Sequence, residues 1–140
     1  MASTWTGWSR PGSIRTWPTF IFQAVCVAHH SIGAIAGLQS GEFGPPVGYE
    51  ETDFAGLQAL INQTLDKLKA LDADSINTFS GGQVIFKLGD TQIPFTTENF
   101  VLCFSLPNLY FHSTTAYDIL RMQGVPLGKR DFLGQMRMGV

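Results

Sequence analysis

The chain has 140 residues, and its nine basic and eleven acidic side chains give a formal net charge of −2. This length suits one domain with one sizeable core. So few cations cannot build the basic face that nucleic acid requires, and a composition of 44% apolar and 14% charged residues excludes a disordered chain. The sequence therefore predicts a globular domain without a nucleic-acid partner, and it does not name a reaction.

The N-terminal residues differ from the rest of the chain in their hydrophobic pattern. Residues 1–18 hold all three tryptophans among Ser, Thr, Gly, Pro and Arg, with neither a helical nor a strand period. We expect an aperiodic N-terminal tail there, a helical-bundle domain over residues 19–134, and a C-terminal tail over residues 135–140.

The two cysteines, Cys26 and Cys103, lie inside apolar runs. This spacing makes no disulfide framework, and buried free thiols suit a reducing compartment. We therefore expect a cytoplasmic protein with both thiols buried.

A secretory signal is the alternative for the N-terminal region. Arg10 and Arg15 precede an apolar run over residues 20–28, as in a signal peptide. Pro18 and Gln23 interrupt that pattern, and the helical rhythm continues beyond it. No apolar stretch approaches the roughly 20 residues that cross a bilayer, so no membrane partner is expected.

The first predicted helix covers residues 19–38. It ends at Gly37 or Gly41, and a Pro- and Gly-rich loop over residues 40–51 follows. One face is an apolar stripe and the adjacent face is made mostly of small residues, which permit close helix packing. The apolar stripe consists of Val25, His29, Ile32 and Ala36, and the small one of Cys26, His30, Gly33, Ala34 and Gly37.

The second predicted helix covers residues 52–71, with apolar residues at spacings of three and four and Thr52 as its cap. Two alternating runs around Gly89-Asp90 then predict a hairpin over residues 84–95. Pro94 makes the second strand an edge strand.

The last predicted helix covers residues 96–123. Pro107 predicts a kink or a restart inside it, and Gly124 ends it. An irregular segment over residues 125–134 is expected to fold back on the bundle.

A polar stripe marks this otherwise apolar last helix. We expect two facing helices to present His29, Asn108 and His112 to one cavity, because buried polar groups need partners. The stripe consists of Ser105, Asn108, His112 and Thr115.

Two interpretations of this stripe stay open. The functional one is a small-molecule pocket or a divalent metal site (Zn, Ni or Fe) with His29 and His112 as ligands and Asn108 or His30 as the third. Asn108 is a poor ligand, and no carboxylate lies nearby in sequence. The structural one is a satisfied polar pair between helices, with His30 a helix-packing residue. Cys103 points away from His112 in an unbroken helix, so a reactive thiol is not expected.

The segments Leu106–Arg121 and Gly124–Gly134, which contain LPNLYFHSTTAYDILR and GVPLGKRDFLG, resemble a known signature. The chain is similar to the family called domain of unknown function nineteen-ninety-three (DUF1993), of the DinB/YfiT-like four-helix-bundle superfamily. The resemblance implies an all-α up-and-down bundle with a small hairpin insert over residues 84–95.

The same resemblance implies a site. In the superfamily, one histidine on the second helix and two on the fourth hold a metal, and the nearest positions here are His29 (or His30), Asn108 and His112. The chain departs from the pattern at Asn108. Family members also often carry a histidine where this chain has Cys103 and an aspartate near His29.

Family members begin with a complete first helix, which residues 1–18 replace here. We therefore expect a bundle lacking its first helix, with an apolar seam covered by the tail, a second chain or a swapped helix. A truncated or misjoined gene product is the alternative.

Three functions follow from these patterns. The first is a small-molecule-binding bundle, a metal- or thiol-dependent transferase or isomerase, in which His29 and His112 ligate metal or act as general acid and base and Asn108 orients substrate or water. The second is a non-catalytic binding or accessory bundle that forms a homodimer. The third is a defective paralogue without a biochemical role.

Overall fold

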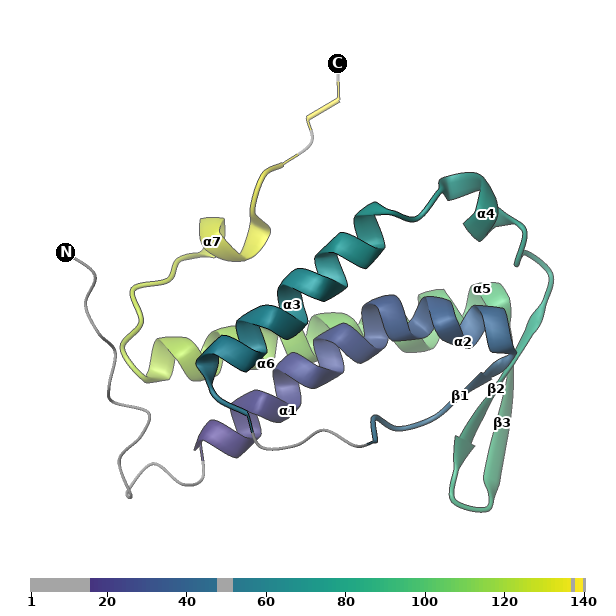
Figure 1. Cartoon of the computed structure of the whole chain (residues 1–140), viewed down its shortest axis with the longest axis horizontal. Helices are drawn as coiled ribbons and strands as arrows, with labels where there is room; N and C mark the ends of the chain where they lie inside the picture. The colour runs from purple at the N-terminus through teal and green to yellow at the C-terminus, as the bar shows by residue number, and fades with distance from the viewer. Residues whose placement is uncertain (1–15, 48–51, 137, 140) are drawn as a thin grey trace.

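The computed structural model describes residues 16–47, 52–136 and 138–139, and side chains from Thr19 onward. Three long helical runs lie over a small sheet at one end of the molecule (Figure 1). The elements in chain order are α1 (Thr16–Ala28), η2 (His29–Gly33), α2 (Ala34–Ser40), β1 (Glu42–Phe43), α3 (Phe54–Lys69), α4 (Ala73–Asn77), β2 (Gln83–Leu88), β3 (Thr91–Thr96), α5 (Thr97–Asn99), η3 (Phe100–Ser105), α6 (Leu106–Met122) and α7 (Lys129–Leu133).

The first helical run confirms the helix predicted over residues 19–38. It is continuous from α1 to α2, but η2 is a turn of π-helix between them. The run ends at Gly41, whose φ of 75° is left-handed and whose N–H bonds the Gly37 carbonyl. The expectation that no apolar stretch approaches the length of a membrane span is wrong for Thr19–Ser40, which is long and apolar enough to cross one; half of its most apolar stretch is buried inside the protein.

The second helix, α3, lies within two residues of its predicted bounds at either end. Its cap is Asp53 and not Thr52: the Gly56 N–H donates to the Asp53 carboxylate at 2.9 Å. Either residue type can cap, and the sequence alone does not say which one stands in the extended conformation before the first turn.

The predicted hairpin is confirmed, with β2 and β3 antiparallel and Val84 opposite Phe95. The loop predicted over residues 40–51 is wrong in part, because β1 pairs parallel to β2 with Phe43 opposite Phe86. A two-residue strand has no alternation to recognise. The described protein is therefore a helical fold with a three-stranded sheet, β1-β2-β3, and not an all-α bundle with a lone hairpin.

The last helical run confirms the predicted helix. Pro107 lies where the π-helical η3 gives way to α6, and because Ser105 and Leu106 are both helical, the run continues through the proline without the predicted restart. Gly124, with a φ of 84°, follows the end of the run. Within the segment predicted to be irregular, residues 129–133 form the short helix α7, which is too brief to show a period.

The core consists of two apolar clusters separated by polar side chains. Both clusters lie along the first helical run, which packs against α6 on one side and α3 on the other. One is at the sheet end and contains Ala34, Leu38, Phe43, Val84 and Phe100; the other contains Ile21, Ala24 and Leu57. Three of the buried polar residues, Gln23, His30 and Ser105, lie on the same helical runs as these clusters, and His30 falls between Ala24 of one cluster and Ala34 of the other.

The outer face of η3 and α6 is more exposed than an interior helix should be. Leu102, Tyr110 and Phe111 are each more than 60% exposed. Cys103 is exposed as well, so the expectation that both thiols are buried is wrong for this residue, while Cys26 is buried. The expectation of a missing first helix concerns residues 1–18, of which 1–15 lie outside the described residues.

Candidate functional site

Two π-helical turns face each other at the centre of the molecule. The Ser105 hydroxyl, at the end of η3, donates to the His30 carbonyl of η2 at 3.0 Å, and both residues are buried. A π-helical turn leaves backbone carbonyls without their usual partners, and such turns often occur at functional sites. Here one of these carbonyls is bonded across the helix interface.

His30 is the most buried of the three histidines, at 8% exposure. Its ring lies 5.4 Å from that of His29 and is stacked on that of His112 at 5.9 Å. Phe43 and Phe104 complete the surroundings with ring distances of 5.5 and 5.8 Å. Its Nδ1 is buried and has no hydrogen-bond partner among the residues that the structure describes. An unpaired buried nitrogen is costly, so it marks a place where a ligand group would be stabilised.

His112 is held by Gln23. The 2.6 Å contact joins His112 Nδ1 to Gln23 Oε1 across the α1–α6 interface. An amide oxygen only accepts, so with this amide orientation Nδ1 carries the proton and Nε2 keeps a lone pair. The sequence reasoning missed Gln23 as a site residue. The signal was its place in an apolar run, because a glutamine buried there must bond to something.

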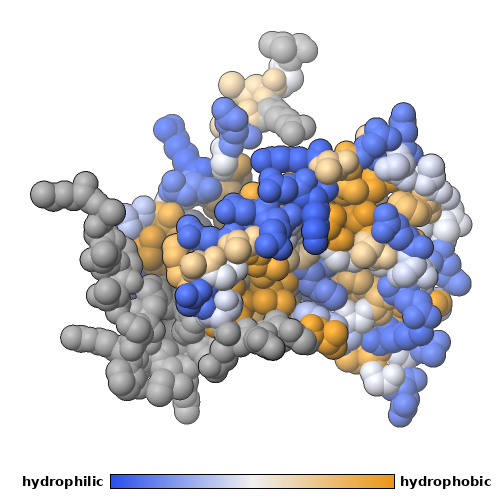
Figure 2. Space-filling view, viewed as in Figure 1, coloured by the Kyte–Doolittle hydropathy of each residue, from blue (hydrophilic) through white to orange (hydrophobic). Residues whose placement is uncertain are grey.

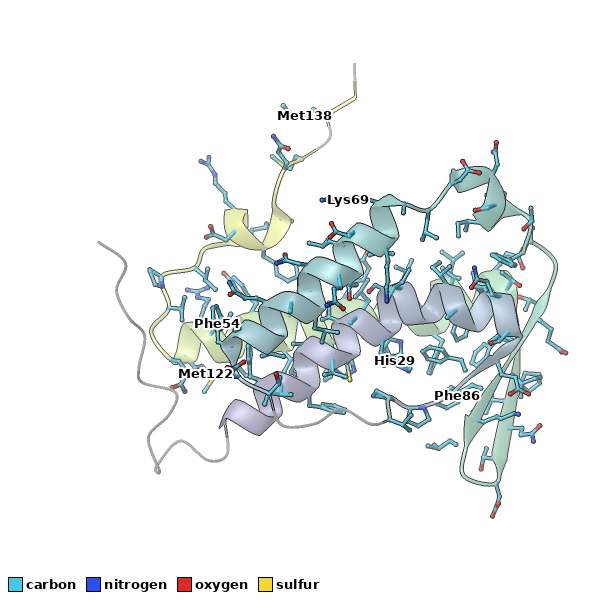
Figure 3. The ribbon with its side chains drawn as sticks, in the orientation of Figure 1. His29, Phe54, Lys69, Phe86, Met122 and Met138 are labelled. Atoms are coloured by element: carbon cyan, nitrogen blue, oxygen red, sulfur yellow. The ribbon has the colours of Figure 1, made fainter. Side chains whose placement is uncertain are left out.

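His29 is fixed by the segment that follows β1. Its Nε2 contacts the Gly44 carbonyl at 2.7 Å, so Nε2 donates a proton to this bond. The ring stacks on Phe43 with centroids 4.3 Å apart. Figure 3 shows His29 where the first helical run passes this segment. The short strand β1 thus places both the carbonyl and the ring that orient His29.

Burial keeps the inner histidines neutral. Desolvation, followed by the charges of His29 and His112, lowers the pKa of His30 to about 4. Burial also lowers the pKa of His112. Near pH 7 both side chains are therefore neutral imidazoles that can accept a proton.

The other members of the polar stripe bond to backbone. Asn108 Nδ2 donates to the Phe104 carbonyl at 2.8 Å, and the Thr115 hydroxyl donates to the Phe111 carbonyl of its own helix. This is the ordinary way in which polar side chains satisfy themselves on a helix. Asn108 is thus half-buried beside the histidines, with one N–H already bonded.

The structure brings His30, more than His29, against His112. The sequence placed His29 on the inward stripe by counting 100° per residue along one α-helix. The buried residues of the first helical run instead include four members of the adjacent small-residue stripe, Cys26, His30, Ala34 and Gly37. The error therefore lay in which of two neighbouring stripes was taken to face inward.

A metal site requires donors that converge. The tautomers would suit one, since a metal-bound imidazole commonly donates its other N–H to an oxygen, as His29 and His112 do. Yet the described residues contain no group of three His, Cys, Asp or Glu side chains that could hold a metal ion. As placed, these residues do not fit a resident metal, and ligation by His29 and His112 stays a prediction.

The thiols lie outside this chemistry. Burial raises the pKa of Cys26 to about 11, which leaves its thiol protonated and unreactive. Cys103 is exposed, on η3.

Comparison with known proteins agrees with the resemblance drawn from the last helix. The family model described as domain of unknown function (DUF1993) matches residues 16–133. The chain belongs to this family. The DUF1993 match covers every described helix and strand.

A solved structure supports the wider placement of this DUF1993 protein. It is similar to the crystal structure of a DinB family member protein from Shewanella denitrificans, with a TM-score of 0.68 and 28% sequence identity. The similarity covers 86% of this chain and 68% of that one. No curated protein matches the chain.

Proposed function

We propose that the protein binds a small hydroxyl- or thiol-bearing molecule at the histidine cluster of His29, His30 and His112, and that it uses neutral imidazole to accept the proton of that group. The observation that carries the proposal is the buried Nδ1 of His30, which has no partner in the described part of the chain. A small donor group bonded there would remove the cost of leaving this nitrogen unpaired.

The roles of His30 and His112 in the proposed reaction follow from their protonation states. The Gln23 contact keeps the proton of His112 on Nδ1, so Nε2 is its basic atom. A general base works best when its pKa is close to the working pH, which favours His112 over His30, whose pKa is about 4. His30 is then a hydrogen-bonding group for the ligand, and His112 is the base of a transferase or isomerase reaction.

The test follows the histidine nitrogens by ¹⁵N NMR while 2-mercaptoethanol, cysteine and ethylene glycol are added to the full chain. We expect at least one probe to shift the His30 and His112 signals, and His112→Leu to abolish the His30 shift. Thr115→Val is the matched control, because Thr115 lies on the same helix and bonds only its own backbone among the described contacts. Histidine signals that none of the probes moves would contradict the proposal.

The same samples test the metal prediction. Zinc, nickel or iron bound in stoichiometric amount, and lost in His112→Ala, would make the cluster a metal centre. Metal content that stays at zero after dialysis against these ions leaves the imidazoles as the reactive groups.

A second candidate rests on the exposed apolar face of η3 and α6. Leu102, Tyr110 and Phe111 are 63%, 61% and 64% exposed, and aromatic side chains are enriched at protein interfaces. We propose that this face joins two copies of the chain, as a bundle lacking its first helix would require. Sedimentation should show a dimer that Tyr110→Ser with Phe111→Ser dissociates; a monomer at all concentrations would contradict it.

A further inference from the structure

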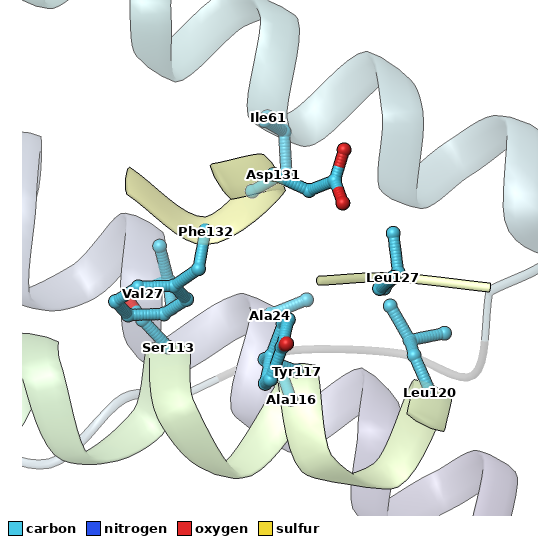
Figure 4. A pocket seen from close by; sticks show the side chains of 10 residues that line it. All are labelled: Ala24, Val27, Ile61, Ser113, Ala116, Tyr117, Leu120, Leu127, Asp131 and Phe132. Atoms are coloured by element: carbon cyan, nitrogen blue, oxygen red, sulfur yellow. The ribbon is translucent and has the colours of Figure 1, made fainter. Parts of the chain in front are cut away.

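A groove separate from the histidine cluster lies where α1, α3, α6 and α7 meet. Its volume is about 330 Å³, and its lining includes Ala24 and Val27 from α1, Ile61 from α3 and Ala116 from α6. Figure 4 shows these side chains with Phe132 of α7 closing one side. The surface there is mostly apolar, beside the hydrophilic ridge that α3 presents in Figure 2.

The size of the groove sets the size of its occupant. An apolar cavity of about 150 Å³ binds benzene, with its six carbon atoms. By this ratio, 330 Å³ accommodates roughly a dozen non-hydrogen atoms. The groove is also open to solvent on one side, so the occupant can keep a polar end in water.

The charge of the groove indicates which polar group its ligand should carry. Of the ten described side chains that line it, Asp131 alone is charged at neutral pH. One carboxylate oxygen, Oδ2, accepts the Gly128 N–H at 2.7 Å, and the other accepts none of the described hydrogen bonds. In Figure 4 this carboxylate stands at the groove beside Ile61.

Two cations on α6 and α7 line a different hollow. Arg121 and Lys129 line a neighbouring depression together with Asp118. The rings of Tyr117 and Phe132, packed edge to face with centroids 5.5 Å apart, belong to both linings and so stand between the two depressions. Arg121 is moreover held over the Tyr117 ring, with its guanidinium carbon 5.6 Å from the ring centre.

We propose that this groove binds an apolar primary ammonium compound, with the hydrocarbon body between α1, α3 and α6 and the ammonium group at Asp131. Apolar burial supplies the affinity. The carboxylate selects the cation, because a charge-assisted hydrogen bond is stronger than a neutral one. This site is independent of the proposed histidine chemistry.

The test compares three probes of nearly equal size, 4-phenylbutylamine, 4-phenylbutanol and 4-phenylbutyrate, titrated into the full chain and followed by backbone amide NMR. The amine should bind with a dissociation constant of about 4 mM, as expected for about eleven non-hydrogen atoms at roughly 0.3 kcal/mol each, the efficiency of larger ligands. Its shifts should centre on Ala24, Ala116 and Phe132. Because Asp131 is solvent-exposed, the amine should bind only about threefold to fivefold more tightly than the alcohol at low salt.

Two variants separate charge from shape. Asp131→Asn keeps an oxygen for the Gly128 N–H and should make the amine bind no better than the alcohol, whereas the matched control Asp118→Asn should leave the preference unchanged. Ala116→Phe should fill the groove and abolish binding of both, with helix content preserved by circular dichroism. Equal affinities for the three probes in the unaltered chain, or shifts elsewhere, would overturn the proposal.

Discussion

The bond between Gln23 and His112 permits a quantitative test of the site. Gln23 is only 6% exposed, so His112→Leu leaves its amide without a partner in the interior. Gln23→Leu likewise strips the His112 N–H of its acceptor. A buried polar group left unpaired costs about 1–3 kcal/mol, and since His112 is half-buried, we expect about 1–2 kcal/mol for each single substitution.

The double variant carries the test. Replacing both partners by apolar side chains is nearly neutral, so Gln23→Leu with His112→Leu should lose much less than the sum of the single losses. The expected coupling is about 1–2 kcal/mol. With a urea slope of about 1.5 kcal/mol per molar, each single variant should unfold roughly 1 M earlier and the double variant should recover most of that shift. Losses that add to within about 0.3 kcal/mol would refute the bond as described.

Three further predictions concern the burial of His30, the packing of Phe100 and the cap of α3. The pKa of His30, about 4 in the folded state against its ordinary 6.5, means that the unfolded chain takes up the proton first. The free energy of unfolding should therefore have its full value above pH 6.5 and fall by about 3 kcal/mol as the pH drops toward 4. Urea unfolding should show this loss, and His30→Asn should largely remove it. Phe100→Ala, at a side chain with 0% exposure, should cost about 3–5 kcal/mol by calorimetry, against little for Phe111→Ala. Asp53→Ala should lower stability by about 1 kcal/mol through the lost cap of α3, as measured by urea unfolding.

Long periodic elements could be predicted from the sequence. The first and last helical runs, α3 and the hairpin all carry local signals, namely apolar spacing and turn glycines. Short elements could not: β1 has two residues and owes its existence to its pairing with β2. The helices α4 and α7, of five residues each, are likewise too short to show a period.

The site was predictable in its residue types more than in its geometry. A polar stripe on α6 facing a histidine-bearing helix was correct in outline, as the contact of His30 with His112 shows. The central histidine is His30, on the buried small-residue stripe with Cys26 and Ala34, and the apolar composition of the neighbouring stripe pointed to His29 instead. Gln23 was visible as a polar interruption, but only the packed helices show that it bonds His112.

The central claim is that His30 and His112 form a neutral imidazole pair with fixed tautomers, and a ¹⁵N NMR spectrum of the histidine side chains across pH tests it most directly. We expect His112 to be protonated on Nδ1 at pH 7 and His30 to stay neutral down to about pH 5, given its pKa of about 4. A His30 that titrates near its ordinary value of 6.5, or a His112 protonated on Nε2, would contradict it.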